Sequence, residues 1–137
     1  MGKKISDSMT SNPCSIDSGK PVAYAAQMMR DEDVGFAPIV EGDRLVGTVT
    51  DRDIAVKVVA EGRDPQTTSV QEIASKNLIT IEPDEDLDEA LQLMAEHQVR
   101  RIAVVEGGRL IGVVAQADIA RDAKPKKTGE VVEEISK

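Results

Sequence analysis

The stretch that decides the fold occurs twice in the chain, as Val40-Glu-Gly-Asp-Arg-Leu-Val-Gly47 and as Val105-Glu-Gly-Gly-Arg-Leu-Ile-Gly112. It belongs to a longer repeat: residues 5–55 align with residues 70–120 without a gap, and sixteen of the 51 aligned pairs are identical. Both copies end in Asp-Ile-Ala, at Asp53 and Asp118. Two such units can pack about a pseudo-twofold axis and form a cleft. Differences between the copies should then show which side of the cleft carries the chemistry.

Length and composition indicate one compact, soluble module. A chain of 137 residues suits a single domain, whereas one repeat of about 50 residues buries too little surface to be stable alone. We therefore expect the two repeats to share one core. The chain has no Trp, one Tyr and one Phe, so this core must consist of aliphatic side chains and Met.

Charge and composition exclude several classes of function. The net charge of -8 opposes binding to nucleic acid, and the few aromatic residues leave little to stack on bases. No window has the roughly 18–20 apolar residues of a membrane span, and the N-terminus lacks an apolar signal segment. The single cysteine, Cys14, excludes an internal disulfide. We expect a cytoplasmic protein with neither nucleic acid nor membrane as a partner.

Each copy predicts the order strand–helix–strand–strand–helix. A helical stripe at i, i+3, i+4 and i+7 is present in both copies and predicts core positions: Val22, Ala25, Ala26 and Met29, then Leu87, Ala90, Leu91 and Met94. The predicted fold class is α/β (α+β), with repeats at 5–61 and 70–123, a polar linker at 62–69 and a charged tail at 124–137. Other predicted elements are a helical lead-in at 5–9, strands at 14–16, 36–40, 44–50, 78–81, 101–106 and 109–115, and helices at 51–61, 86–97 and 116–123.

The segment Gly47-Thr-Val-Thr-Asp-Arg-Asp53 ends a strand and begins a helix. Gly47 allows another group to approach the backbone closely. Thr50 and the free N–H groups of the helix start could bind a phosphate, and Asp53 could accept hydrogen bonds from the vicinal hydroxyls of a ribose. Thr50 and Asp53 also fit a capping box, which needs no ligand. The two interpretations do not exclude each other.

The second copy differs from the first at the positions that bear on whether these residues bind a ligand or cap a helix. Ala115 replaces the Thr50 hydroxyl, yet Asp118 is retained, which favours a duty for the aspartates beyond capping. Arg100 and Arg101 stand where the first copy has Gly35 and Phe36. Two arginines there could clamp a phosphate by paired hydrogen bonds, or they could be exposed charges at a strand edge.

Nothing in the sequence points to catalysis or to a metal site. His97, the only histidine, stands near a predicted helix end and fits a solvated surface position. Cys14 has no histidine nearby in sequence and fits a small buried residue. Cys/His spacing typical of metal ligands is absent, and the acidic runs fit solvated helix ends. We expect a protein that is not an enzyme and has no metal ligands.

The repeats resemble a tandem pair of cystathionine-β-synthase (CBS) domains, often called a Bateman module. The resemblance covers residues 5–122 and rests on Met29 with Phe36-Ala-Pro-Ile-Val40 and Gly47–Asp53, and on Met94 with Arg101-Ile-Ala-Val-Val105 and Gly112–Asp118. It is similar to small stand-alone two-CBS proteins of bacteria and archaea. The family implies two β-α-β-β-α repeats packed by their sheets, often in dimers, and ligands such as AMP, ADP, ATP, S-adenosylmethionine or NAD(H).

The resemblance also implies positions for two ligand sites. In the first, Asp53 would hold the ribose and Thr50 the phosphate, apolar residues would flank the adenine, and two arginines would lie on the phosphate side; the flanking residues and arginines are Leu78, Ile79, Val99, Arg100 and Arg101. The mirror site would use Asp118 with Pro13, Cys14, Val34, Gly35 and Phe36. Because it lacks both the hydroxyl and the arginine, we expect the mirror site to be degenerate.

The sequence therefore predicts a non-catalytic regulatory module for energy sensing, with no obligatory cofactor and an adenine nucleotide (AMP or ATP) as ligand. The alternatives are a ligand-free dimeric interaction or stress-response protein, a sensor of S-adenosylmethionine or NAD(H), and, more weakly, a cation sensor. A homodimer and an unidentified regulated protein are the expected partners. The apolar faces of the helices predicted at 51–61 and 116–123 are candidates for the dimer seam or for internal core. Their residues are Ile54, Val58 and Val59 on the first helix and Ile119 on the second.

Overall fold

The computed structural model describes residues 3–122, which form two compact units. The first-repeat unit consists of residues 14–78, and the second-repeat unit combines residues 3–13 with residues 79–122. Each unit is named after the repeat that supplies its sheet. The predicted tail at 124–137 lies outside the described residues.

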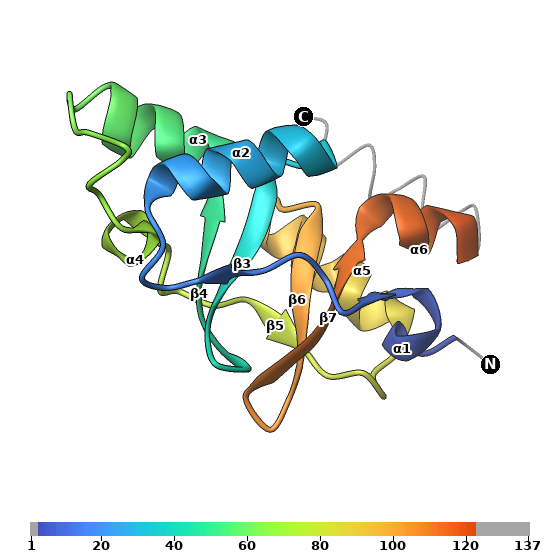
Figure 1. The fold of residues 1–137 in the computed structure, drawn as a ribbon. Coiled ribbons are helices and arrows are strands. Elements are labelled where there is room, and N and C mark those ends of the chain that lie inside the picture. Colours follow the sequence, from blue (N-terminus) through green and yellow to red (C-terminus); the bar gives the residue numbers. More distant parts are fainter. Residues whose placement is uncertain (1–2, 123–137) are drawn as a thin grey trace. The chain divides into compact units, whose positions relative to one another are not determined.

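The first-repeat unit is a small mixed sheet covered by helices. In chain order its elements are β2 (Ile16–Asp17), α2 (Val22–Glu32), β3 (Phe36–Glu41), β4 (Arg44–Thr50), α3 (Asp51–Ile54), the π-helix η1 (Ala55–Val59) and α4 (Val70–Ile73). β2 pairs with β3 in parallel and β3 pairs with β4 antiparallel, so β3 is central. Helices α2 and α3 lie side by side above these strands in Figure 1.

The second-repeat unit has the same architecture. Its elements are α1 (Ile5–Ser8), β1 (Thr10–Ser11), β5 (Thr80–Ile81), α5 (Leu87–His97), β6 (Arg101–Glu106), β7 (Arg109–Ala115) and α6 (Gln116–Asp122). β5 pairs with β6 in parallel, β6 with β7 antiparallel, and β1 with β7 antiparallel. The predicted α/β class with two β-α-β-β-α repeats is confirmed. The predicted pseudo-twofold packing concerns the placement of the units and stays a prediction.

The repeated turn residues explain why both copies form the same hairpin. Gly42 (φ 65°) and Gly107 (φ 61°) adopt the left-handed conformation that a tight reversal between two strands requires. The first helix of each repeat ends in the same way, at Asp33 (φ 56°) and Gln98 (φ 54°), whose left-handed backbone terminates α2 and α5. The predicted strands at 44–50, 101–106 and 109–115 match β4, β6 and β7 residue for residue.

Each unit has its own aliphatic core. The predicted helical stripes supply much of it: Val22, Ala25 and Met29 are buried in the first-repeat unit, and Leu87, Ala90, Leu91 and Met94 in the second-repeat unit. One position of the stripe is wrong, because Ala26 is exposed. The buried face of α2 is therefore narrower than the sequence pattern indicates.

The short lead-in helices pack on the sheet of the other repeat. Ile5 of α1, from the start of the first repeat, is fully buried in the core of the second-repeat unit. Val70 and Ile73 of α4, from the start of the second repeat, are buried in the core of the first-repeat unit. Each compact unit is thus completed by residues from the start of the other repeat.

The helix predicted at 51–61 begins as expected but changes its winding. After α3 the backbone forms η1, with hydrogen bonds five residues apart from the Ala60 N–H to the Ala55 carbonyl (2.9 Å) and from the Arg63 N–H to the Val58 carbonyl (2.9 Å). Turns of this kind are rare in proteins, and those that occur are often found near functional sites.

Within residues 3–122, no helix has the length and apolar character needed to cross a membrane.

Candidate functional site

The start of α3 holds the threonine–aspartate pair in a reciprocal arrangement. The Thr50 hydroxyl accepts a hydrogen bond from the Asp53 N–H (3.1 Å), and Asp53 Oδ2 accepts one from the Thr50 N–H (2.9 Å). The capping interpretation of these residues is thereby confirmed. The Asp53 side chain nevertheless keeps 20% of its surface exposed, so solvent still reaches it.

The corresponding aspartate of the second copy has a different partner. Ala115 precedes α6 and has no side-chain oxygen with which to cap it. Asp118 Oδ1 instead accepts a hydrogen bond from Arg121 Nη2 at 3.1 Å, and 22% of the Asp118 side chain is exposed. An aspartate at this position therefore persists, partly accessible, where the threonine cap is absent.

In each unit, the start of the first long strand (β3 or β6) lies against the beginning of the helix that follows the hairpin. Phe36 is paired with Thr50 across the sheet, and the Gly35 carbonyl accepts a hydrogen bond from the Asp51 N–H (3.0 Å). A side chain at Gly35 would collide with the Asp51 carboxylate, only 2.7 Å from the place of a Cβ atom. Because Asp51 is exposed, its carboxylate can turn away from a Cβ atom, so this contact alone does not require a glycine at position 35.

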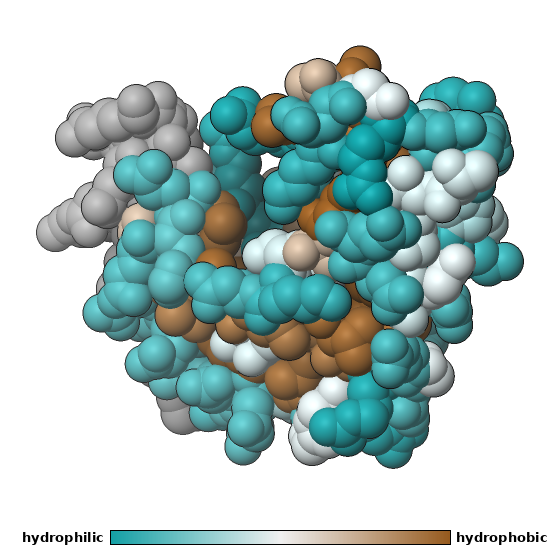
Figure 2. All heavy atoms as spheres, turned by 90° about the vertical axis from the view of Figure 1, so that its left-hand side faces the viewer, coloured by the Kyte–Doolittle hydropathy of each residue, from teal (hydrophilic) through white to brown (hydrophobic). Residues whose placement is uncertain are grey.

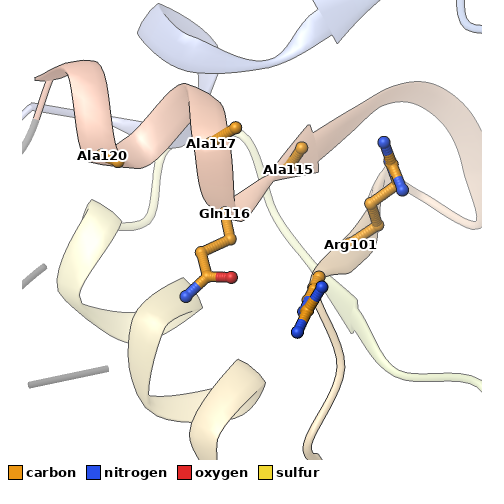
Figure 3. A pocket seen from close by; sticks show the side chains of 6 residues that line it. Arg101, Ala115, Gln116, Ala117 and Ala120 are labelled. Carbon is orange, nitrogen blue, oxygen red and sulfur yellow. The ribbon is translucent and has the colours of Figure 1, made fainter. Parts of the chain in front are cut away.

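The arginines occupy the matching place in the second-repeat unit. Arg101 is paired with Ala115, and the Arg100 carbonyl accepts a hydrogen bond from the Gln116 N–H (2.8 Å). A cavity of about 330 Å³ opens here, lined by Arg100, Arg101, Ala115, Gln116, Ala117 and Ala120. Figure 3 shows Arg101 of β6 and Gln116 of α6 on opposite sides of it. Both arginines line this cavity, Arg100 is exposed and Arg101 is half-buried at the start of β6, so both interpretations of these residues stay open.

Gln116 is the residue of this cavity that sequence reasoning missed. Its Nε2 atom is buried and has no hydrogen-bond partner among the described residues. A buried amide that lacks an acceptor is costly, and such a group calls for an acceptor atom nearby. The signal was the repeat itself, because Gln116 stands where the first copy has Asp51.

The apolar residues assigned to the adenine differ in exposure. Leu78 is 37% exposed at the end of the first-repeat unit. Ile79 and Val99 are partly buried against the core of the second-repeat unit. Their remaining exposed surface is what a flat apolar ring could cover.

The residues assigned to the mirror site are likewise distributed over both units. Val34 packs against the core of the first-repeat unit, and Pro13 is half-buried at the end of the lead-in of the second-repeat unit. Cys14 is exposed, so the expectation of a buried cysteine is wrong. Desolvation and, after it, a hydrogen bond with Glu32 and that carboxylate's charge raise the pKa of the Cys14 thiol.

The structure thus forms one candidate half-site within each unit. Thr50 and Asp53 lie with Gly35 and Phe36 in the first-repeat unit, whereas Arg100 and Arg101 lie with Gln116 in the second-repeat unit. The meeting of the two half-sites in one pocket stays a prediction. Among residues 3–122, no three His, Cys, Asp or Glu side chains form a group that could hold a metal ion.

Comparison with known proteins identifies a family model and relatives that match most of this chain. The family model of the CBS domain matches residues 3–60 and 70–124. The CBS domain-containing protein YhcV of Bacillus subtilis is 40% identical over 116 residues, which span 85% of this chain and 82% of YhcV. Hypoxic response protein 1 of Mycobacterium tuberculosis is also 40% identical over 116 residues, spanning 84% of this chain and 81% of the relative.

Two solved structures are similar to this fold. The crystal structure of Hypoxic Response Protein I with two coordinated zinc ions has a TM-score of 0.81 at 38% identity, covering 88% of this chain and 99% of that protein. The CBS domain pair of protein MJ0100, in complex with 5′-methylthioadenosine and S-adenosylmethionine, has a TM-score of 0.78 at 28% identity, covering 88% and 95%.

Proposed function

The chain belongs to the CBS-domain family as a tandem pair, and from this premise we propose that it is a non-catalytic regulatory module that binds an adenine nucleotide such as AMP or ATP. The observation that carries the proposal is the division of polar groups between the half-sites. The first-repeat unit supplies a hydroxyl and a partly exposed carboxylate, whereas the second-repeat unit supplies two arginines beside a cavity. An adenine nucleotide needs both sets.

The proposed roles follow from the chemistry of each group. Asp53 accepts hydrogen bonds from the two ribose hydroxyls, because an ionised carboxylate only accepts. Arg100 and Arg101 hold the phosphate, for which the forked guanidinium is well shaped. Ile79 and Val99 present apolar surface to the adenine ring. Gln116 Nε2, buried beside the arginines, offers a further donor to an acceptor atom of the ligand.

The MJ0100 pair supports an adenosine compound as the ligand class, because both molecules in that complex contain adenosine. The residues of this chain favour a phosphate over a sulfonium. A sulfonium is cationic and would be repelled by Arg100 and Arg101, whereas a phosphate is attracted. The net charge of -8 weakens the binding of any anion, so we expect affinities in the micromolar range or weaker.

The first prediction separates the two aspartates. A ligand at about 100 times its dissociation constant stabilises a protein by about 2.7 kcal/mol, which raises the melting temperature by several degrees. We expect AMP or ATP to produce this rise in the parent chain. The Asp53→Ala variant should lose it, whereas the Asp118→Ala variant should keep most of it. Differential scanning fluorimetry with AMP, ATP, NADH, 5′-methylthioadenosine and S-adenosylmethionine measures the effect.

The aspartate at position 118 makes a matched control, because the two substitutions remove the same group from equivalent positions. Asp53→Ala also removes part of a helix cap, so each variant must be compared with its own ligand-free melting temperature. Equal loss of the ligand effect in both variants would contradict a single good site. A larger rise with S-adenosylmethionine than with AMP would favour the sulfonium alternative.

A ligand-free interaction protein is the second candidate, and a specific observation favours it. Val56 and Val59 are 47% and 71% exposed. Two apolar side chains exposed on one helical turn could form part of a surface that contacts another protein. Under this alternative the module forms homodimers and binds a regulated protein without any nucleotide. A parent chain whose melting temperature responds to none of the five compounds would support it.

A further inference from the structure

A lysine of the π-helix contacts the aspartate of the proposed site. Lys57 Nζ lies 3.3 Å from Asp53 Oδ1 and donates a hydrogen bond to the Ile73 carbonyl at 3.1 Å. Both distances fall within one compact unit. The ammonium group therefore joins Asp53 to the end of α4, and the Lys57 side chain is still 46% exposed.

This contact does not have stability as its main effect. Ion pairs between partly exposed side chains contribute about 0–1 kcal/mol, since water screens them and two side chains must be held in place. What the contact does fix is the orientation of the carboxylate. Asp53 Oδ2 is held by the Thr50 N–H and Asp53 Oδ1 by Lys57 Nζ. The Asp53 carboxylate is thus fixed at both oxygens.

The fixed carboxylate keeps acceptor capacity for a ligand. A carboxylate has about four lone-pair sites, two on each oxygen. The Thr50 N–H uses one site on Oδ2, and the Lys57 ammonium faces Oδ1 as an ion pair, so each oxygen keeps at least one acceptor site. Two acceptor sites, one per oxygen, match the two hydroxyls of a ribose. A rotating carboxylate would present these sites together only part of the time, and binding would have to arrest the rotation.

Lys57 is itself held by a segment that is anchored near Thr50. Ser75 forms a pair of backbone hydrogen bonds with Thr48 (2.9 and 3.1 Å), two residues before Thr50 on β4. The Ile73 carbonyl, two residues before Ser75, then receives the Lys57 ammonium. Backbone hydrogen bonds thus hold the 73–75 segment against β4, and this segment in turn holds the Lys57 ammonium beside Asp53. The ammonium is therefore in position without a ligand.

The second copy lacks this arrangement. Asp122 stands where the first copy has Lys57, and it accepts a hydrogen bond from the Ser8 hydroxyl. The partner of Asp118 is Arg121, whose side chain is 72% exposed. A long and largely exposed arginine orders its partner less than a lysine held at two points. The second copy therefore lacks both the Thr50 hydroxyl, which Ala115 replaces, and a lysine that holds its aspartate.

We propose that Lys57 is a positioning residue that fixes the Asp53 carboxylate for the vicinal hydroxyls of a ribose. The proposal rests on the nucleotide-binding function proposed above and adds to it a residue outside the threonine–aspartate motif. It makes Lys57 a determinant of selectivity for ribose over deoxyribose, because only a ribose uses both remaining acceptor sites of Asp53.

The test compares Lys57→Met with the parent chain by isothermal titration calorimetry, using AMP and 2′-deoxy-AMP. Methionine keeps much of the aliphatic length and removes the ammonium. We expect AMP to bind about tenfold more weakly to the variant, the size of effect that loss of one charge-assisted hydrogen bond produces. The affinity for 2′-deoxy-AMP should change by less than about twofold. A purely structural or long-range electrostatic role would weaken both ligands alike.

Arg30→Met is the matched control, because Arg30 forms an exposed ion pair with Asp31 in the same unit and its removal changes the net charge equally. It should leave both affinities unchanged. A Lys57→Met variant that melts within a few degrees of the parent and binds AMP as tightly would overturn the role of Lys57 alone. A parent chain that binds neither AMP nor 2′-deoxy-AMP would overturn the nucleotide-binding function, and the role of Lys57 with it.

Discussion

At the scale of single residues, Gly47 and Gly112 are glycines because another segment of the chain crosses each of them. A Cβ atom at Gly47 would lie 3.1 Å from Ala74 Cβ and 3.2 Å from the Ser75 carbonyl oxygen. At Gly112 it would lie 2.6 Å from Met9 Sδ and 2.9 Å from the Thr10 carbonyl oxygen. The close approach that the sequence predicted at Gly47 is confirmed, and the approaching group is the lead-in of the other repeat.

These distances predict unequal costs for the two alanine substitutions. Gly112→Ala should lower the free energy of unfolding by about 2–3 kcal/mol, because the methyl group would overlap a backbone oxygen. Gly47→Ala should lower it by about 1 kcal/mol, since its nearest atoms need move only slightly. Urea denaturation measures both values. Gly19→Ala is the control, with its nearest atom at an ordinary 3.6 Å. Equal stability of all three variants would contradict the crossing of strand and lead-in.

The residues that sequence reasoning missed have one property in common. Gln116 owes its interest to the cavity beside Arg101, and Lys57 is anchored by the distant Ile73 carbonyl, although its contact with Asp53 lies only four residues away in the chain. Thr50 and Asp53, by contrast, form a motif within four residues, and their mutual hydrogen bonds could be predicted from spacing alone. Local chemistry was therefore predictable, and contacts made by folding were not.

At the scale of elements, α3 and α6 begin at equivalent positions of the two repeats, but only α3 has a side-chain cap, from Thr50. Thr50→Ala should lower the free energy of unfolding by about 1 kcal/mol, because the Asp53 N–H loses its acceptor. Ala115→Ser should raise it by about 0.5–1 kcal/mol, since serine there would restore a capping box with Asp118 three residues later. Thr50→Ser, which keeps the hydroxyl, is the neutral control. Thermal or urea unfolding that moved in the same direction for Thr50→Ala and Ala115→Ser would contradict equivalence of the two helix starts.

The long elements followed from the sequence, as did the short helix α1, whereas two other short elements did not. β4, β6 and β7 were bounded correctly because Gly42 and Gly107 mark the turns and the hydrophobic pattern marks the strands. α4 and β1 were missed, since four and two residues are too few to show a period. Both missed elements belong to the lead-ins, so the packing of each lead-in on the other repeat's sheet could not be read from local pattern.

At the scale of the whole molecule, the structure divides the predicted dimer seam into core and surface. Val58 and Ile119 are fully buried, and Ile54 packs against the core, so these three belong to the interior of their units. Val59 is exposed, and Val56 beside it adds apolar surface. Figure 2, which views the side where α4 is labelled in Figure 1, shows a mostly hydrophilic surface with apolar areas within it. The candidate contact surface is therefore reduced to Val56 and Val59.

If these two valines form the dimer contact, a charge placed there should separate the protomers. We expect the parent chain to have the mass of a dimer at micromolar concentration in sedimentation velocity, and Val59→Asp to have the mass of a monomer, because burying an unpaired carboxylate in an apolar contact is costly. Gln71→Glu adds the same charge at an exposed position of the same unit and should stay dimeric. A Val59→Asp variant with the dimer mass would place the contact elsewhere, and a monomeric parent would exclude the homodimer. Since position 59 follows η1's Lys57 by only two residues, retained AMP binding by the monomeric variant would show that the proposed nucleotide site does not depend on the dimer.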